Sequence, residues 1–128
     1  MEKQSVTSGA PWESEVGYCR AVRKGPFIEV AGTTAMQNGE LVGNGDPFLQ
    51  TQIVIGIMKK AIEELGGKLE DVVRTRIFVT NIEDFEQVGK AHGQYFSDIK
   101  PACTLVEVSA LVDPGMLVEM EMTAIISE

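Results

Sequence analysis

Two amphipathic segments, each lying between segments of strand character, most restrict the folds that this chain can adopt. The first begins at Asp46-Pro47, where Asp can accept unpaired amide protons and Pro fits the first helical turn. Its apolar residues recur three and four positions apart up to Leu65, and Gly66-Gly67 follows as a stop signal. This pattern predicts a helix over 47–65.

The second helix is predicted to begin at 81 or 82 and to run to about 99. Its apolar stripe contains Phe85, Val88, His92, Tyr95 and Ile99.

Gly56 lies inside the first helix at a cost of about 1 kcal/mol relative to Ala, which suggests close contact with a sheet there. Strand character is found at 5–8, 18–24, 27–31 and 73–79, an irregular loop is expected over 9–17, and Asn38-Gly39 predicts a tight turn.

The last quarter of the chain alternates between two kinds of side chain over 104–108 and 117–123, which is typical of strands with two different faces. In the second of these strands one face carries Val118, Met120 and Met122, and the other carries Leu117, Glu119, Glu121 and Thr123. The first face is expected to be core, and the second face carries carboxylates.

Each predicted helix joins two strands, and such crossovers require parallel pairing somewhere in the sheet. We therefore predict an α+β fold, a two-layer sandwich with one mixed sheet, two helices on one face, and a single domain over 1–128. The other face mixes charged and aromatic residues, namely Phe27, Glu29, Arg74, Arg76, Phe78 and Glu119. A face of this kind suits a subunit interface better than water, so we expect a homo-oligomer.

Composition argues against several classes of protein. The net charge of -8 and pI near 4.6 disfavour nucleic acid, because binding to phosphates depends on clustered Lys and Arg. One His and two distant cysteines offer no metal-ligand spacing, so we expect no metal, and we expect no cofactor. The longest apolar run, 53–58, is too short to cross a membrane. Without a visible secretory signal, we expect a cytoplasmic protein in which Cys19 and Cys103 are free thiols.

Several motifs together resemble one family over nearly the whole chain. They are Gly17-Tyr18, Ala31-Gly32, the acidic-to-apolar segment 71–79, Asp84-Phe85, and Pro101-Ala102-x-Thr-x-Val-Glu-Val followed by Leu-Val-Glu-Met-Glu. By these motifs the chain resembles the RidA family, also called the YjgF or endoribonuclease L-PSP family. The resemblance implies a chorismate-mutase-like fold, a homotrimer, and a small-molecule ligand in each cleft between subunits.

Active members of this family hydrolyse imines and enamines to a 2-oxoacid and ammonia, and the resemblance implies that Glu119 and Tyr18 are catalytic residues of the cleft. The expected binding residues are Ala31, Gly32, Cys103, Thr104 and His92. Two positions depart from the family pattern: Cys103 stands where the family has an arginine that grips the substrate carboxylate, and Ala31 stands where it has a serine. Loss of that arginine favours an uncharged or cationic ligand.

Each candidate residue also has a plainer interpretation. Glu119 either positions water or substrate, or forms an interface ion pair with Arg74 or Arg76. Tyr18 is a cleft residue or a packing aromatic. His92 lies on an apolar helix stripe, where a buried structural histidine is the commoner role. Cys103 is expected to line the cleft wall instead of acting as a nucleophile, because no His stands near it in sequence.

Two functional hypotheses follow. The protein is a deaminase-type hydrolase with altered substrate specificity, or it is a catalytically silent trimer that binds a metabolite. A ribonuclease is disfavoured by the charge balance.

Overall fold

The computed structural model describes residues 2–127. In chain order the elements are β1 (Lys3–Val6), α1 (Pro11–Val16), β2 (Ala21–Lys24), β3 (Phe27–Thr33), β4 (Met36–Gln37), β5 (Glu40–Leu41), α2 (Pro47–Glu64), β6 (Val72–Val79), α3 (Phe85–Phe96), β7 (Ala102–Glu107) and β8 (Val118–Ile125). Short 3-10 helices over Leu69–Asp71 and Ile82–Asp84 precede β6 and α3.

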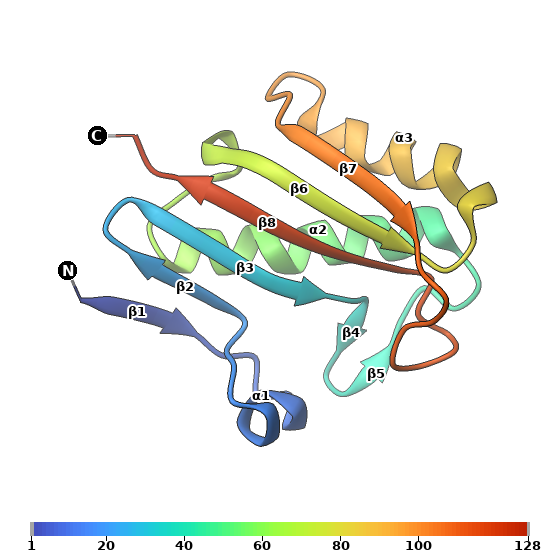
Figure 1. The fold of residues 1–128 in the computed structure, drawn as a ribbon, viewed down its shortest axis with the longest axis horizontal. Helices are drawn as coiled ribbons and strands as arrows, with labels where there is room; N and C mark the ends of the chain where they lie inside the picture. The colour runs from blue at the N-terminus through green and yellow to red at the C-terminus, as the bar shows by residue number, and fades with distance from the viewer. Residues whose placement is uncertain (1, 128) are drawn as a thin grey trace.

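Six of the strands form one mixed sheet in the order β1-β2-β3-β8-β6-β7 (Figure 1). The last strand of the chain, β8, lies in the middle and is antiparallel to both β3 and β6. β3 and β6 are therefore parallel to each other and are joined through α2, while β6 and β7 pair in parallel and are joined through α3. The predicted crossovers and the mixed sheet are confirmed.

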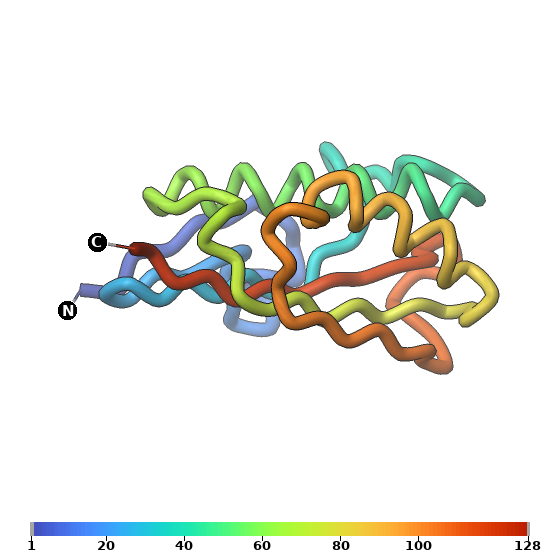
Figure 2. The backbone as a smooth tube through the Cα atoms, turned by 90° about the horizontal axis from the view of Figure 1, so that it is seen from above, coloured from blue at the N-terminus to red at the C-terminus, as the bar shows by residue number. Residues whose placement is uncertain are grey.

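The two long helices cover the same face of the sheet, as Figure 2 shows in a view along the layers. This confirms the α+β two-layer sandwich. The alternation predicted for the closing strand is also confirmed, since Val118, Met120 and Met122 are buried beneath the helices and Glu119 and Glu121 are not. On the helix side, Val54, Met58 and Ile62 of α2 are fully buried against this strand and its neighbours.

The start of α2 is fixed by its predicted cap. The amide of Leu49 donates to Oδ1 of Asp46 at 3.0 Å, and Pro47 takes the first helical position. The helix ends before Gly66, which adopts a left-handed φ of 89°. The tight turn between β4 and β5 is confirmed as well, because Asn38 and Gly39 both have positive φ. No helix within 2–127 has the length and apolar character needed to span a membrane.

The loop predicted over 9–17 was wrong, because it contains the helix α1. Pro11 is suited to the first turn of a helix, and Gly17 ends the helix with a φ of 93°. The carboxylate of Glu13 is buried and accepts hydrogen bonds from the amide and hydroxyl of Ser8. These bonds fix α1 at the end of the sheet and place Trp12 on its surface.

Two details of the predicted helices were also wrong. Gly56 does not contact the sheet: it is exposed, and a Cβ added to it would meet nothing within 4 Å. The second helix begins at Phe85 after a 3-10 turn and ends at Phe96. Phe85 is exposed while Phe96 is buried, because the core-facing stripe of α3 runs through Val88, Ala91 and Phe96. The remaining strand boundaries differ from the predicted ones by at most three residues.

Candidate functional site

A bulge in β3 shapes the site. Val30 pairs with Met122 and Thr33 pairs with Met120, so the two residues Ala31 and Gly32 lie opposite the single residue Glu121. One extra residue on one strand bends that strand and redirects its side chains. β3 therefore turns away from the sheet at Ala31-Gly32, where the amide of Ala31 donates to the carbonyl of Arg20 at 2.9 Å.

Gly32 makes room for the carboxylate of Glu119. A Cβ added to Gly32 would lie 2.6 Å from Oε2 of Glu119 and 3.1 Å from its carboxyl carbon. Any side chain at this position would therefore push the carboxylate away. The sequence predicted both residues as site residues, and the structure places them in direct contact.

Arg20 lies beside them, although the sequence pattern did not identify it as a site residue. Its Nη2 donates to the carbonyl of Gly32 at 2.6 Å, and its guanidinium carbon lies 5.6 Å from the centre of the Tyr18 ring. That distance is typical of a cation–π contact. The local signal for Arg20 was its position two residues after Tyr18, which places both on one face of an extended segment.

The charge of Glu119 is set by three influences. Partial burial raises the pKa of its carboxyl, which is the largest effect, the positive charge of Arg20 lowers it, and the nearby carboxylate of Glu121 raises it. The net pKa lies above the ordinary value of 4.5. Glu119 is therefore a better proton acceptor than an exposed glutamate.

Glu119, Arg20, Tyr18 and Gly32 line one cavity of about 420 Å³, which we call the Glu119 cavity. Its apolar lining comes from segments far apart in sequence: Trp12 of α1, Met36 of β4, and Val112 and Met116 of the loop before β8. Met116 is buried, and we call the three exposed residues, Trp12, Met36 and Val112, the apolar rim. The Trp12 side chain is 53% exposed and Val112 is 78% exposed. A polar base with an apolar rim is the usual form of a small-molecule site.

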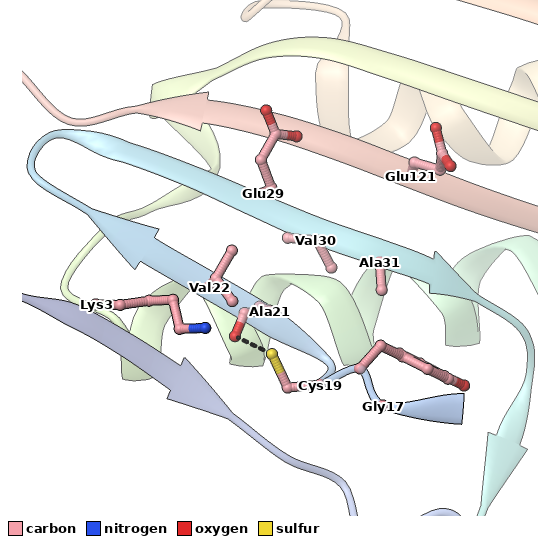
Figure 3. A pocket seen from close by; sticks show the side chains of 10 residues that line it. Lys3, Gly17, Cys19, Ala21, Val22, Glu29, Val30, Ala31 and Glu121 are labelled. Carbon is pink, nitrogen blue, oxygen red and sulfur yellow. Dashed lines mark hydrogen bonds between the residues drawn. The ribbon is translucent and has the colours of Figure 1, made fainter. Parts of the chain in front are cut away.

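Ala31 lines a different hollow on the open face of the sheet. This hollow also has a volume of about 420 Å³ but is wider and shallower, and Glu119 is not part of it (Figure 3). Its other labelled residues include Gly17, Cys19, Glu29 and Glu121. Tyr18 borders both spaces. The Glu119 cavity is the more enclosed of the two and contains the carboxylate with the shifted pKa, so we take it as the candidate site.

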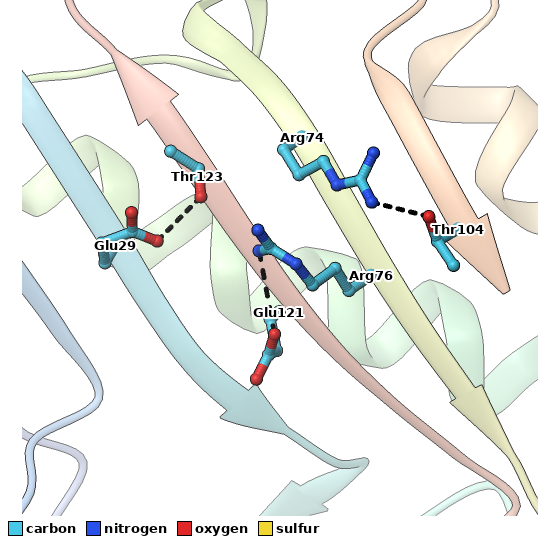
Figure 4. A network of polar contacts seen from close by, with 6 residues as sticks. All are labelled: Glu29, Arg74, Arg76, Thr104, Glu121 and Thr123. Atoms are coloured by element: carbon cyan, nitrogen blue, oxygen red, sulfur yellow. Dashed lines mark hydrogen bonds and ion pairs between the residues drawn. The ribbon is translucent and has the colours of Figure 1, made fainter. Parts of the chain in front are cut away.

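Within one chain, Cys103 and Thr104 are not part of the Glu119 cavity. Both are exposed on β7, the edge strand, where Cys103 pairs with Thr75 and Thr104 accepts a hydrogen bond from Nη2 of Arg74 at 2.7 Å (Figure 4). Strand β6 separates them from β8. Alternation along β7 directs Cys103 toward the helix side and Thr104 toward the open face. Cys103 and Cys19 are both free thiols.

His92 also lies outside the cavity. Its Nε2 is 3.0 Å from Oγ1 of Thr75, and its ring centre is 4.6 Å from that of Phe96. Thr75 is fully buried on the helix side of the sheet, whereas Glu119 points to the other side. Burial lowers the pKa of His92, which favours the neutral ring. These contacts agree with a structural histidine.

The open face carries a polar network that leaves Glu119 out. Arg76 forms an ion pair with Glu121 at 3.8 Å, and Thr123 donates to Glu29 at 2.8 Å (Figure 4). Among residues 2–127, neither Arg74 nor Arg76 pairs with Glu119. The predicted alternative, an ion pair of Glu119 with one of these arginines, is therefore not formed within a chain. The same described range contains no group of three side chains suited to bind a metal.

Comparison with known proteins identifies the family. The family model for endoribonuclease L-PSP matches residues 8–126. The chain belongs to the endoribonuclease L-PSP family. The structure of Rv2704 from Mycobacterium tuberculosis, a member of the YjgF/YER057c/UK114 family, is 43% identical and superposes with a TM-score of 0.89, covering 98% of this chain and 100% of that one.

Two further relatives connect the chain to the Rid and RutC members of the endoribonuclease L-PSP family. The Rid family protein YyfA from Yersinia pestis is 30% identical with a TM-score of 0.85, covering 98% of this chain and all of that one. The 3-aminoacrylate deaminase RutC from Acinetobacter baylyi is 30% identical over 108 residues, covering 84% of this chain and 85% of that protein. The family resemblance inferred from the sequence motifs is confirmed.

Proposed function

We propose that this member of the endoribonuclease L-PSP family is an imine or enamine deaminase, a hydrolase with altered substrate specificity. The observation that carries the proposal is the Glu119 carboxylate, half-buried beside Gly32 and facing a cavity with an apolar rim. The deaminase name of the RutC relative supports the reaction class.

The proposed reaction is the addition of water to a carbon–nitrogen double bond. Water oxygen bonds to the carbon of the protonated imine while Glu119 accepts a proton from the water, which gives a neutral carbinolamine. Glu119 then returns its proton to nitrogen, the carbon–nitrogen bond breaks as the hydroxyl proton passes to solvent, and the products are a carbonyl compound and ammonia. A carboxylate whose pKa is raised by partial burial suits both the acceptance and the return of the proton. Tyr18 borders the same cavity and is proposed to orient the substrate.

We also propose that the active form is a cytoplasmic homotrimer with one cleft between each pair of subunits. Apolar side chains exposed on and beside the open side of the sheet support an interface there, namely Phe27, Val73, Val106 and Ile125. The edge strand β7 presents Cys103 and Thr104 away from its own Glu119 cavity. In the proposed trimer, these two residues approach the cavity of a neighbouring subunit. Light scattering of the purified protein tests the trimer directly.

The alternative is a silent metabolite-binding trimer, and one assay separates the two functions. The substrate 2-iminobutanoate or 2-iminopropionate is generated in place, and release of ammonia or 2-oxoacid is followed with and without the protein. A deaminase releases ammonia faster than buffer does. A rate equal to that of buffer with both substrates removes the ordinary deaminase, which acts on these 2-imino acids, and favours the binding alternative.

A further inference from the structure

The Glu119 cavity contains a cation that the sequence motifs do not predict. The arginine that family members carry after Pro-Ala is Cys103 in this chain, and Cys103 lies outside the cavity of its own chain. Arg20 lines that cavity instead, beside Tyr18 and Gly32. We infer that Arg20 binds the carboxylate of the ligand, and that the ligand is a small monocarboxylate whose apolar part lies against Trp12. The reaction class of this ligand rests on the proposed function.

Arg20 is held in place while most of its donors stay available. The bond from Nη2 to the carbonyl of Gly32 uses one of the five N–H groups of the guanidinium. The ring of Tyr18, with its centre 5.6 Å from the guanidinium carbon, adds a cation–π contact. Nε is buried, and within residues 2–127 it has no hydrogen-bond partner. The Nε–H is itself too buried to meet a ligand, so a carboxylate in the cavity would accept from the terminal N–H groups that the Gly32 carbonyl leaves free.

Arg20 and Glu119 face the cavity with opposite charges. They lie close enough for Arg20 to lower the pKa of Glu119, but no ion pair joins them among the described residues. Two opposite charges that do not neutralise each other fit a ligand with both an anionic group and a nitrogen donor. An imino or enamino acid has its carboxylate and its nitrogen on the same or adjacent carbons. It therefore matches this pair, with the carboxylate toward Arg20 and the nitrogen toward Glu119.

The rim of the cavity indicates the rest of the ligand. Trp12, Met36 and Val112 are apolar and all at least 36% exposed, and they line the same cavity as Arg20 and Glu119. Burial of such side chains by an apolar group is favourable, at about 25 cal/mol for each Å² removed from water. An acid with an apolar side chain gains this contact, and the smallest acids do not. From the loss of the family arginine we expected an uncharged or cationic ligand. With Arg20 in the cavity, we instead infer an anionic ligand.

The chain offers a direct probe of this site, because Trp12 is its one tryptophan. The indole N–H of Trp12 gives a single signal in a nitrogen–proton NMR spectrum of the full chain. We would titrate wild type with 4-methylpentanoate and with its uncharged counterpart 4-methylpentanamide. The expected result is a shift of the Trp12 signal by both probes, with the carboxylate binding about tenfold more tightly or better.

Two variants connect this preference to Arg20. Arg20→Gln is expected to remove the preference for the carboxylate, while Arg23→Gln keeps it. Arg23 is a matched control, since it lies on β2 three residues after Arg20 and also donates to backbone carbonyls, those of Gly25 and Leu65, but does not line the Glu119 cavity. Equal binding of the two probes by wild type overturns the inference. A preference that survives in Arg20→Gln overturns it as well.

The inference stays testable even if Arg20→Gln fails to fold. The Nε–H signal of Arg20 in wild type is then followed, and it should shift with the carboxylate and not with the amide; an unchanged signal overturns the inference. Ammonia release is measured separately with the imino acids. If the protein releases ammonia but shows no preference for the carboxylate probe, the inferred role of Arg20 is wrong and the proposed deaminase function stands. If Arg20 binds the carboxylate probe but no ammonia is released, the deaminase proposal is wrong and the inferred role of Arg20 stands.

Discussion

The carboxylate of Glu119 occupies the space that a side chain at Gly32 would need, since a Cβ there would lie 2.6 Å from Oε2. This contact joins the bulge of β3 to the central strand β8 and sets the base of the cavity. The catalytic geometry proposed for this protein therefore depends on the absence of one methyl group.

Gly32→Ala is predicted to displace the Glu119 carboxylate. The added methyl group overfills the contact, and overpacking of this kind costs about 1–3 kcal/mol of unfolding free energy. Ligand binding in the cavity should be weakened as well, because the carboxylate can no longer lie over residue 32. Chemical denaturation and the Trp12 signal measure the two effects. A variant with unchanged stability and unchanged binding would show that the Gly32–Glu119 contact is unimportant.

Gly56→Ala should have the opposite effect on stability. Gly56 is exposed in the middle of α2, and a Cβ there meets nothing within 4 Å. Alanine in place of glycine in a helix interior stabilises by about 1 kcal/mol through the lower entropy of the unfolded chain. Thermal or urea unfolding measures this gain. Destabilisation would mean that Gly56 makes a contact that is absent from the single chain, as in a subunit interface.

The raised pKa of Glu119 makes stability depend on pH. The folded protein holds the Glu119 proton more tightly than the unfolded chain, so the unfolding free energy falls as pH rises from 4.5 through the higher folded pKa. Glu119→Gln removes this pH-dependent fall in the unfolding free energy. The variant should therefore gain stability relative to wild type as pH rises through that range, and the difference between them should be constant below it. Urea unfolding at a series of pH values checks the sign.

Glu13→Ala is predicted to loosen α1 and with it the rim of the cavity. The buried Glu13 carboxylate accepts hydrogen bonds from Ser8, and its loss leaves these donors without their partner at a cost of about 1–2 kcal/mol. The Trp12 indole signal should move at the same time. Glu15→Ala is the control, because Glu15 is exposed on the same helix and should change stability by less than about 0.5 kcal/mol. Equal effects of the two substitutions would contradict this role of Glu13.

The fold was predictable because its main signals are local. The cap at Asp46 and the alternation through Val118, Met120 and Met122 reflect the surroundings of each residue in one helix or one strand, and both were confirmed. The helix α1 was missed because Gly9, Pro11 and Gly17 occur so close together that they resemble a loop. Here Pro and Gly mark the two ends of a single short helix.

The site was only partly predictable, because its geometry depends on pairing between distant strands. The bulge at Ala31-Gly32 exists only relative to β8, so its sequence signal was no more than a glycine. Arg20 belongs to the site through its bond to the Gly32 carbonyl, and its position two residues after Tyr18 was only a weak local signal of this. His92 was predicted from a stripe that it does share with the core of α3, but the sheet separates it from Glu119.

The most direct test of the account is the rate of ammonia release from 2-iminobutanoate by wild type and Glu119→Gln under the same conditions. We expect wild type to exceed the buffer rate. For Glu119→Gln the rate above buffer should be at least about 100-fold smaller than for wild type, because the variant can no longer accept the proton from water. Glu86→Gln, a substitution of an exposed glutamate in α3, should retain the wild-type rate. A Glu119→Gln variant as fast as wild type would contradict the account.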